Sequence, residues 1–208
     1  MKIIRTTQND GKETEEIEYT SFELSDFSKL KNYKERINYC NDLLRRIGAG
    51  SSRIVFEINN KQVLKIAKNI VGIEQNETEA RSLIQQKYSD IVTFCYHSHS
   101  NFLWVVMERA KPVRPAQFKE LCGIAWKDFQ HYISYQNGVL NKNTKIYIED
   151  GVLDAGDNAI LTQRLIELCK ESGVGLLDVT KITSWGVVDR NGVPILVLVD
   201  FGAINNHK

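Results

Sequence analysis

Apolar residues recur every three or four positions in some segments of this chain and alternate with polar residues in others. The first spacing is typical of helices and the second of strands. Helices are predicted over 25–48, 71–88, 115–134 and 157–173. Strands are predicted over 53–58, 62–67, 91–98, 101–110, 184–189 and 193–202. The order of these elements predicts an α+β fold, with a strand-rich first half and a more helical second half.

Local signals sharpen several boundaries. Gly48 and Gly173 are expected to end helices, Pro115 to occupy a first helical position, and Asp157 to cap the last helix. The Asn-Asn pair in "NNK" is expected to make a hairpin turn, since asparagine tolerates positive φ. The polar residues 1–24 predict an edge strand or a loose arm, and 136–156 predicts an irregular insert.

Composition narrows the class of protein. Hydrophobic residues make up 42% and charged residues 25% of the 208 residues, which predicts a packed core. The formal net charge of +1 gives no reason to expect nucleic acid or an anionic membrane as partner. No apolar run is long enough to span a bilayer, and the N-terminal residues are not expected to form a signal peptide. The four scattered cysteines are expected to be reduced thiols of a cytoplasmic protein.

Two histidines, His97 and His99, alternate in "YHSHS". They could hold a metal ion, but without a third ligand nearby a surface loop is the favoured interpretation.

A glycine motif, a lysine and an acid follow one another in the first half. Gly48 and Gly50 lie in "IGAGSSRIVFEI", where glycines let backbone N–H groups approach phosphate oxygens. Lys65 ends "QVLK" on the next strand, within reach of such phosphates. Glu79 lies on the following helix and could pair with Lys65, with Glu77 as the competing acid.

Together with Asp200-Phe-Gly, these motifs resemble the protein-kinase-like superfamily, in particular small bacterial and phage kinase-like proteins. The glycine motif reads G-A-G-S-S-R-I-V, with Arg53 where a third glycine is expected. The resemblance covers about residues 44–204 and implies a bilobal fold. It implies an antiparallel sheet plus helix C at 25–110, a minimal helical lobe at 111–208, and an arm at 1–24.

The resemblance also implies an ATP site with Mg²⁺. Met107 would lie at the back of the nucleotide pocket, which is compatible with a buried methionine that fills a gap in the core. The segment "WVVMERA" would be the strand and hinge that join the lobes. The implied nucleotide-binding residues are Gly48, Gly50, Ser51, Val55, Lys65, Glu79, Met107, Glu108 and Ala110.

The catalytic loop departs from the family pattern. Asp178 lies where the catalytic carboxylate is expected, with Lys65 as the second catalytic residue and Asp200 as a metal ligand. The usual asparagine is missing. Counting from Asp178 reaches Thr183, whereas aligning on "WGV" reaches Ser184, which we take as the second metal ligand. Lys181 could stabilise a phosphate or face water.

The sequence ends six residues after Gly202, so we expect neither an activation segment nor a peptide-docking floor. Several functions remain open. One is a phosphotransferase that acts on a small molecule, on itself or on a protein partner. Another is a catalytically impaired binding or regulatory module. AMP transfer is a third, and a structural or inhibitory protein with an empty cleft is a fourth. The oligomeric state stays open.

Overall fold

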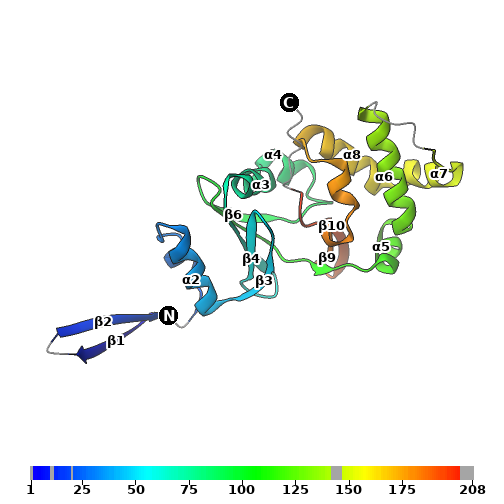
Figure 1. The fold of residues 1–208 in the computed structure, drawn as a ribbon. Helices are drawn as coiled ribbons and strands as arrows, with labels where there is room; N and C mark the ends of the chain where they lie inside the picture. Colours follow the sequence, from blue (N-terminus) through cyan, green and yellow to red (C-terminus); the bar gives the residue numbers. More distant parts are fainter. Residues whose placement is uncertain (1, 10–11, 20, 142–146, 202–208) are drawn as a thin grey trace.

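The computed structural model describes residues 2–9, 12–19, 21–141 and 147–201. Figure 1 shows a strand-rich lobe in the middle, a helical lobe beside it, and a long hairpin that extends away from both. The predicted α+β class and the bilobal arrangement are confirmed. Gly202 of the Asp-Phe-Gly motif lies outside the described residues.

The strand-rich part contains the following elements: β1 (Lys2–Asn9), β2 (Lys12–Tyr19), α1 (Leu24–Phe27), α2 (Tyr33–Leu43), β3 (Arg45–Ala49), β4 (Arg53–Glu57), β5 (Gln62–Ala67), α3 (Ile70–Ala80), α4 (Ser82–Lys87), β6 (Cys95–Ser98) and β7 (Trp104–Glu108). The second part contains β8 (Lys111–Pro112), α5 (Pro115–Cys122), α6 (Trp126–Asn141), α7 (Asp150–Asn158), α8 (Ile160–Ser172), η1 (Leu176–Thr180), η2 (Ile182–Ser184), β9 (Trp185–Arg190) and β10 (Val193–Leu198).

The main sheet is antiparallel, in the order β3-β4-β5-β7-β6. Strict alternation along its central strands separates two faces. One face, with Phe56, Leu64 and Val106, packs under α1 and α2. The other face carries Val63 and Met107 and lies under α3, which contacts β5, β6 and β7. Residues of β4 and β5 that face α3 are therefore also available to a ligand on that side.

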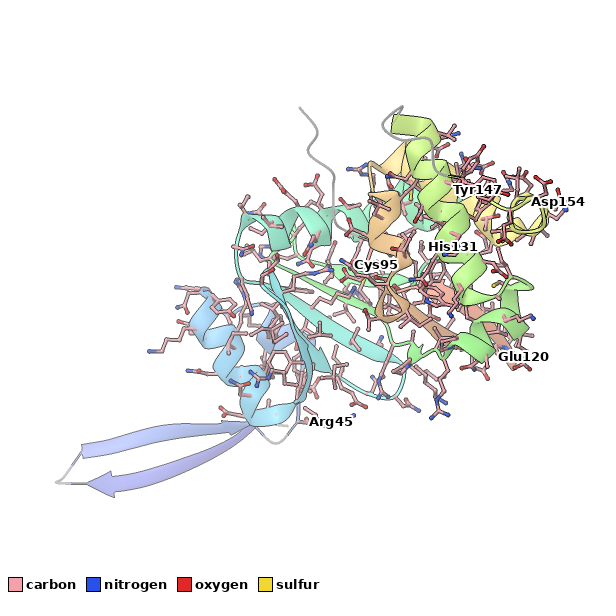
Figure 2. All side chains as sticks on the ribbon, turned by 45° about the vertical axis from the view of Figure 1, so that its right-hand side comes forward. Arg45, Cys95, Glu120, His131, Tyr147 and Asp154 are labelled. Carbon is pink, nitrogen blue, oxygen red and sulfur yellow. The ribbon has the colours of Figure 1, made fainter. Side chains whose placement is uncertain are left out.

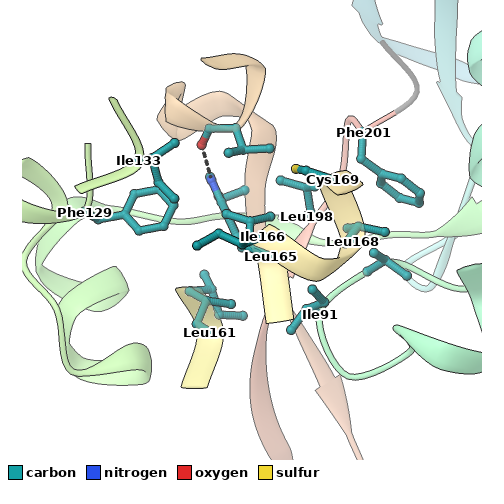
Figure 3. Close-up of a cluster of buried hydrophobic side chains, with 14 of the residues drawn as sticks. Ile91, Phe129, Ile133, Leu161, Leu165, Ile166, Leu168, Cys169, Leu198 and Phe201 are labelled. Carbon is teal, nitrogen blue, oxygen red and sulfur yellow. Dashed lines mark hydrogen bonds between the residues drawn. The ribbon is translucent and has the colours of Figure 1, made fainter. Parts of the chain in front are cut away.

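The helical lobe has its own hydrophobic core, which joins α5, α6 and α8 to β10. Figure 3 shows Leu165 and Leu168 of α8 among these buried side chains, with Leu198 and Phe201 close by. Phe201 is fully buried and therefore fixes the end of the segment that carries Asp200. Tyr88, which lies before the predicted lobe boundary, also packs into this core.

Figure 2 shows on which lobe several labelled residues lie. Arg45 lies on the side of the main sheet, whereas Glu120, His131, Tyr147 and Asp154 all lie on the helical side. No helix in the described ranges is long and apolar enough to cross a membrane.

Each of the first three predicted long helices is divided in two. The segment 25–48 breaks because Asn32 starts a new helix, its Oδ1 accepting from the Glu35 N–H at 2.9 Å, and Arg45–Ala49 joins the sheet. Gly48 therefore lies in a strand rather than at a helix end. Arg81 has φ −58° and ψ 119°, which separates α3 from α4.

The helical lobe differs from expectation in related ways. Gly123 is left-handed with φ 83° and ends α5, so that α6 begins anew at Trp126 and continues to Asn141. Much of the predicted irregular insert is therefore helical in α6 and α7, and residues 142–146 lie outside the described residues. Pro115 starts α5 and Gly173, with φ 78°, ends α8, as predicted.

One local prediction is wrong, whereas the predicted β4–β5 hairpin forms with a turn of a different kind. Asp157 lies inside α7 and accepts from the Tyr132 hydroxyl at 2.7 Å instead of capping α8. The Asn-Asn turn needs no positive φ, and its Asn59 side chain instead accepts from the Lys61 N–H at 2.8 Å. Left-handed asparagine occurs in the other hairpin, at Asn191 with φ 60°. Residues 1–24 were predicted to form an edge strand or a loose arm. The described part of this segment contains strands β1 and β2, which pair with each other rather than with the main sheet.

Candidate functional site

A cavity of about 510 Å³ lies between the α3-facing side of the main sheet and the β9–β10 hairpin. Its walls come from the glycine turn, defined here as Gly48–Arg53, and from the hinge, defined as Glu108–Val113. Thr183, Gly186 and Asp200 close it from the helical lobe. A volume of this size is typical of sites for small molecules and cofactors.

Lys65 points into this cavity from β5 and is held firmly. Its Nζ donates to Glu79 Oε2 at 2.7 Å and to the backbone oxygen of Val199 at 2.6 Å. The side chain is 8% exposed, and burial lowers the pKa of its ammonium against the opposing effect of Glu79. Lys65 thereby joins the sheet to the segment that follows β10.

Glu79 is the acid that pairs with Lys65, whereas Glu77 is exposed. Its carboxylate is completely buried and contacts two cations, Lys65 through Oε2 and Arg53 through Oε1. Burial alone would raise its pKa, but the two neighbouring cations outweigh burial and lower it. Glu79 is therefore a carboxylate shared between two cations.

Arg53 is the functional residue to which sequence reasoning gave no role. It takes the place of the third glycine, and its Nη2 donates to Glu79 at 2.9 Å and to Asp200 Oδ1 at 2.6 Å. Its Nη1 donates to Asn76 at 3.3 Å. A signal was present: Arg53 precedes Val55 by two positions on β4, so both side chains share the cavity face.

The glycine turn is tied to the start of α3. The Lys68 N–H donates to Ser52 O at 2.8 Å, and Asn69 Nδ2 donates to Ser51 O at 3.3 Å. Gly50 and Ser51 both line the cavity, and a Cβ at Gly50 would meet no described atom within 4 Å. Because no steric contact requires glycine at Gly50, the open space there is available to a ligand.

Residues 107–110, to which the resemblance gives the back of the pocket and the hinge, lie beside the cavity. Met107 is fully buried and packs with Val63 and Val55, both of which line the cavity, so Met107 lies one layer behind its wall. Glu108 lines the cavity, but its carboxylate accepts from Arg190. Its N–H donates to Phe94 O at 2.7 Å.

Ala110 and Gly186 bring the hinge and β9 unusually close. A Cβ on Gly186 would lie 2.6 Å from the Ala110 Cβ and 2.9 Å from the Lys111 oxygen. Glycine at position 186 is therefore required by the packing of the cavity floor against the hinge.

The predicted catalytic loop forms η1 and η2. Asp178 lies on η1 outside the cavity lining, and its carboxylate is 3.4 Å from Lys181 Nζ. Ser184 is buried, and its hydroxyl donates to Asp178 O at 3.1 Å. Thr183, the alternative in the sequence, lines the cavity. Lys181 thus pairs with an acid rather than pointing at the cavity.

The predicted magnesium ligands do not fit a metal site in this arrangement. Asp200 is ion-paired with Arg53, and the Ser184 hydroxyl is directed to a backbone carbonyl. Across the described ranges there is no group of three or more His, Cys, Asp or Glu residues that could hold a metal ion. His97 and His99 therefore belong to no such group.

Thr93 was also missed by the sequence reasoning. Its side chain lines the cavity, is 1% exposed, and its Oγ1 has no hydrogen-bond partner among the described residues. A buried hydroxyl without a partner is rare in folded proteins. No sequence signal marked Thr93, because its burial depends on the bridge between Val92 and Leu198.

No protein-family model matches the chain, and no curated protein matches it. Solved structures do match. The streptomycin–ATP complex of APH(2")-IIa is 16% identical over 83% of this chain and 72% of that chain, with a TM-score of 0.35. The ADP-bound aminoglycoside phosphotransferase APH(2'')-Ib is 15% identical over 81% of this chain and 69% of that chain, with a TM-score of 0.34.

The geometry of the cavity is evidence for the fold that does not depend on these matches. A strand lysine pairs with a helix glutamate beneath a glycine turn, and both lie beside a cavity between two lobes. With these features the chain has the protein-kinase-like fold.

Proposed function

We propose that this protein binds a nucleoside triphosphate, with ATP as the first candidate, in the cavity between its lobes. The observation that carries the proposal is Lys65, a buried ammonium group held at the cavity by Glu79 and Val199 O. A cation oriented in this way offers its charge to phosphate oxygens that approach beneath the glycine turn.

The charge of the cavity supports the same proposal. Of the described residues that line it, four carry a positive charge and two a negative charge. The lining therefore has a formal charge of +2, although the whole chain has only +1. Positive charge concentrated in a cavity attracts an anionic ligand such as a triphosphate.

The apolar part of the cavity suits a purine ring. Val55 and Val63 line one wall, and the hinge, whose Ala110 lines the cavity beside Gly186, forms the opposite edge. We propose that the base lies between these walls and contacts backbone groups of Glu108 and Ala110.

Thermal unfolding of the full chain with and without ATP tests the binding proposal. A ligand at one hundred times its Kd stabilises the folded state by about 2.7 kcal/mol. We expect ATP to raise the Tm of the parent protein and to leave that of Lys65→Met unchanged. Arg45→Gln, which removes an exposed cation on β3, is the control and should respond like the parent. An unchanged parent Tm would refute nucleotide binding.

We further propose phosphotransferase activity toward a small molecule, the chain itself or a protein partner, with Asp178 orienting the acceptor hydroxyl. Asp178 lies on η1 outside the cavity lining, and the support for this role is that Ile182 and Thr183 of the adjacent η2 line the cavity. Transfer of the γ-label from ATP to an acceptor hydroxyl, lost in Asp178→Asn, would support phosphotransfer. Label released only as inorganic phosphate would indicate hydrolysis by water instead. Transfer of an α-label to product would instead indicate AMP transfer.

A second candidate is a binding or regulatory module without transfer. The ion pair between Arg53 and Asp200 favours it, because this pair occupies the carboxylate that the fold would use for a metal. ATP binding without any labelled product would support this candidate.

A further inference from the structure

Arg53 is positioned to act on the phosphates that the cavity would receive. Its guanidinium lines the cavity and is anchored from behind by Glu79 and Asn76. Both anchors lie on α3 and are fully buried, so the position of the guanidinium does not depend on a ligand.

The third partner of Arg53 is different. The Asp200 side chain is 59% exposed, whereas that of Arg53 is 8% exposed. An exposed carboxylate that binds a buried guanidinium through one oxygen is exchangeable, since water can solvate it when it leaves. A phosphate oxygen has the same charge and hydrogen-bonding capacity as this carboxylate oxygen.

A divalent cation bound to Asp200 Oδ1 would share that oxygen with Arg53. Mg²⁺ binds oxygen at about 2.1 Å, so an ion on Asp200 Oδ1 would lie within about 4.7 Å of the Arg53 Nη2, which donates to that same oxygen at 2.6 Å. The like charges would repel one another strongly at this distance. Ser184, the predicted second ligand, is engaged with the Asp178 carbonyl.

We propose that Arg53 binds the phosphate groups directly and takes the place of a divalent cation, so that the nucleotide binds without metal. Asp200 is the group that the phosphate displaces from Arg53. This inference rests on the proposed nucleotide binding and specifies its chemistry: the ligand is the free polyphosphate rather than its magnesium complex.

Three other cations near the cavity, Lys65, Lys68 and Arg109, do not offer the same arrangement. Lys65 is directed to Glu79 and Val199 O, and the Lys68 ammonium is directed to the Gly50 oxygen. Arg109 pairs with Glu57 at 3.0 Å. Among these cations, Arg53 alone has an exposed acid as a partner that a phosphate can replace without disturbing buried contacts.

Calorimetric titration of the full chain with ATP, in excess EDTA and in excess MgCl₂, tests the proposal. We expect the parent Kd in EDTA to lie within threefold of its value in Mg²⁺ or below it. Binding that is weakened threefold or more by EDTA would overturn the inference and leave nucleotide binding intact. Absence of binding in both buffers would instead overturn the proposed function itself.

Two variants separate Arg53 from general charge effects. Arg53→Gln should weaken binding in EDTA about tenfold, which corresponds to about 1.4 kcal/mol, and Mg²⁺ should restore part of it by occupying the freed Asp200. A loss smaller than threefold would overturn the inference. Arg45→Gln, the same substitution on the neighbouring strand outside the cavity, is the matched control.

Asp200→Asn keeps the inference testable if Arg53→Gln does not fold, because Asp200 is exposed. If the carboxylate competes with phosphate, this variant should bind ATP about threefold more tightly than the parent in EDTA. A metal ligand at this position would give the opposite result in Mg²⁺. Binding in EDTA that is no tighter than that of the parent would overturn the inference.

Discussion

Glu79 pairs with Lys65 and is also shared with Arg53. The sharing predicts that substitutions at Glu79 and Lys65 have unequal effects on stability. Lys65→Met removes the ammonium and keeps the apolar stem, and Glu79 retains Arg53 at 2.9 Å. Glu79→Gln instead leaves two buried cations without their common carboxylate.

The magnitudes follow from burial. Loss of the two charge-assisted hydrogen bonds of Lys65, with Glu79 still paired, should cost about 1–3 kcal/mol of unfolding free energy. Removal of the shared carboxylate should cost about 3–5 kcal/mol, because cations that are 8% exposed lose a buried partner. The double variant should cost less than the two single changes together, because one cation is then also gone.

Urea unfolding followed by circular dichroism measures these differences without nucleotide. For a chain of this size each kcal/mol shifts Tm by about 2–4 °C, so thermal melts give an independent check. Arg45→Gln, an exposed ion-pair residue, should change stability by less than about 1 kcal/mol. A Lys65→Met variant as unstable as Glu79→Gln would show that Arg53 is not a second counter-ion of Glu79.

Four further outcomes are expected. The lowered pKa of Glu79 contributes stability that is present above its unfolded value of 4.5 and is lost as pH falls through the folded pKa. The unfolding free energy of Glu79→Gln should therefore depend less on pH in this acidic range than that of the parent. An equally steep pH dependence of the two proteins would contradict this. Thr93→Val removes a buried hydroxyl that has no hydrogen-bond partner among the described residues. The unfolding free energy should stay level or rise by up to about 1 kcal/mol, while ATP binding weakens. A clear loss of stability would show that the hydroxyl makes a hydrogen bond. Gly186→Ala should cost about 1–3 kcal/mol because its Cβ meets the hinge, whereas Gly50→Ala should be neutral in chemical unfolding; equal effects would refute the packing argument. Burial raises the pKa of three thiols, Cys40, Cys95 and Cys169, to about 11 or 12, so native alkylation by iodoacetamide at pH 8 should be slow at each and rapid after unfolding. Fast native labelling, read by mass spectrometry, would contradict these raised pKa values.

The main sheet was predictable because its strands obey one simple rule. Alternation along β4, β5 and β7 assigns Val55, Val63 and Lys65 to one face, and this assignment depends only on neighbouring residues in the chain. The lysine, the glycine turn and the helix acid could therefore be recognised together. Helix breaks were harder to predict, since Arg81 carries no glycine or proline signal and its conformation depends on how α3 and α4 pack.

The ion pair between Arg53 and Asp200 could not be predicted from the sequence. Arg53 and Asp200 are 147 positions apart, and nothing local states that a guanidinium on β4 reaches the segment after β10. Position alone assigned Asp200 to a metal, because that is what the motif implies. The arginine that binds this carboxylate was visible only as a departure from a third glycine and as a residue on the same strand face as Val55.

That departure also changes how the two lobes are joined. Lys65 on β5 donates to Val199 O, and Arg53 on β4 donates to the adjacent Asp200, so two cations of the sheet bind consecutive residues of the other lobe. A ligand that takes Arg53 from Asp200 removes one of these links and leaves the Lys65 contact. If the phosphate also binds the glycine turn, it replaces a direct link between lobes with one through the ligand. Occupancy of the cavity and the rigidity between the lobes are then coupled through one guanidinium, which a glycine at position 53 could not provide.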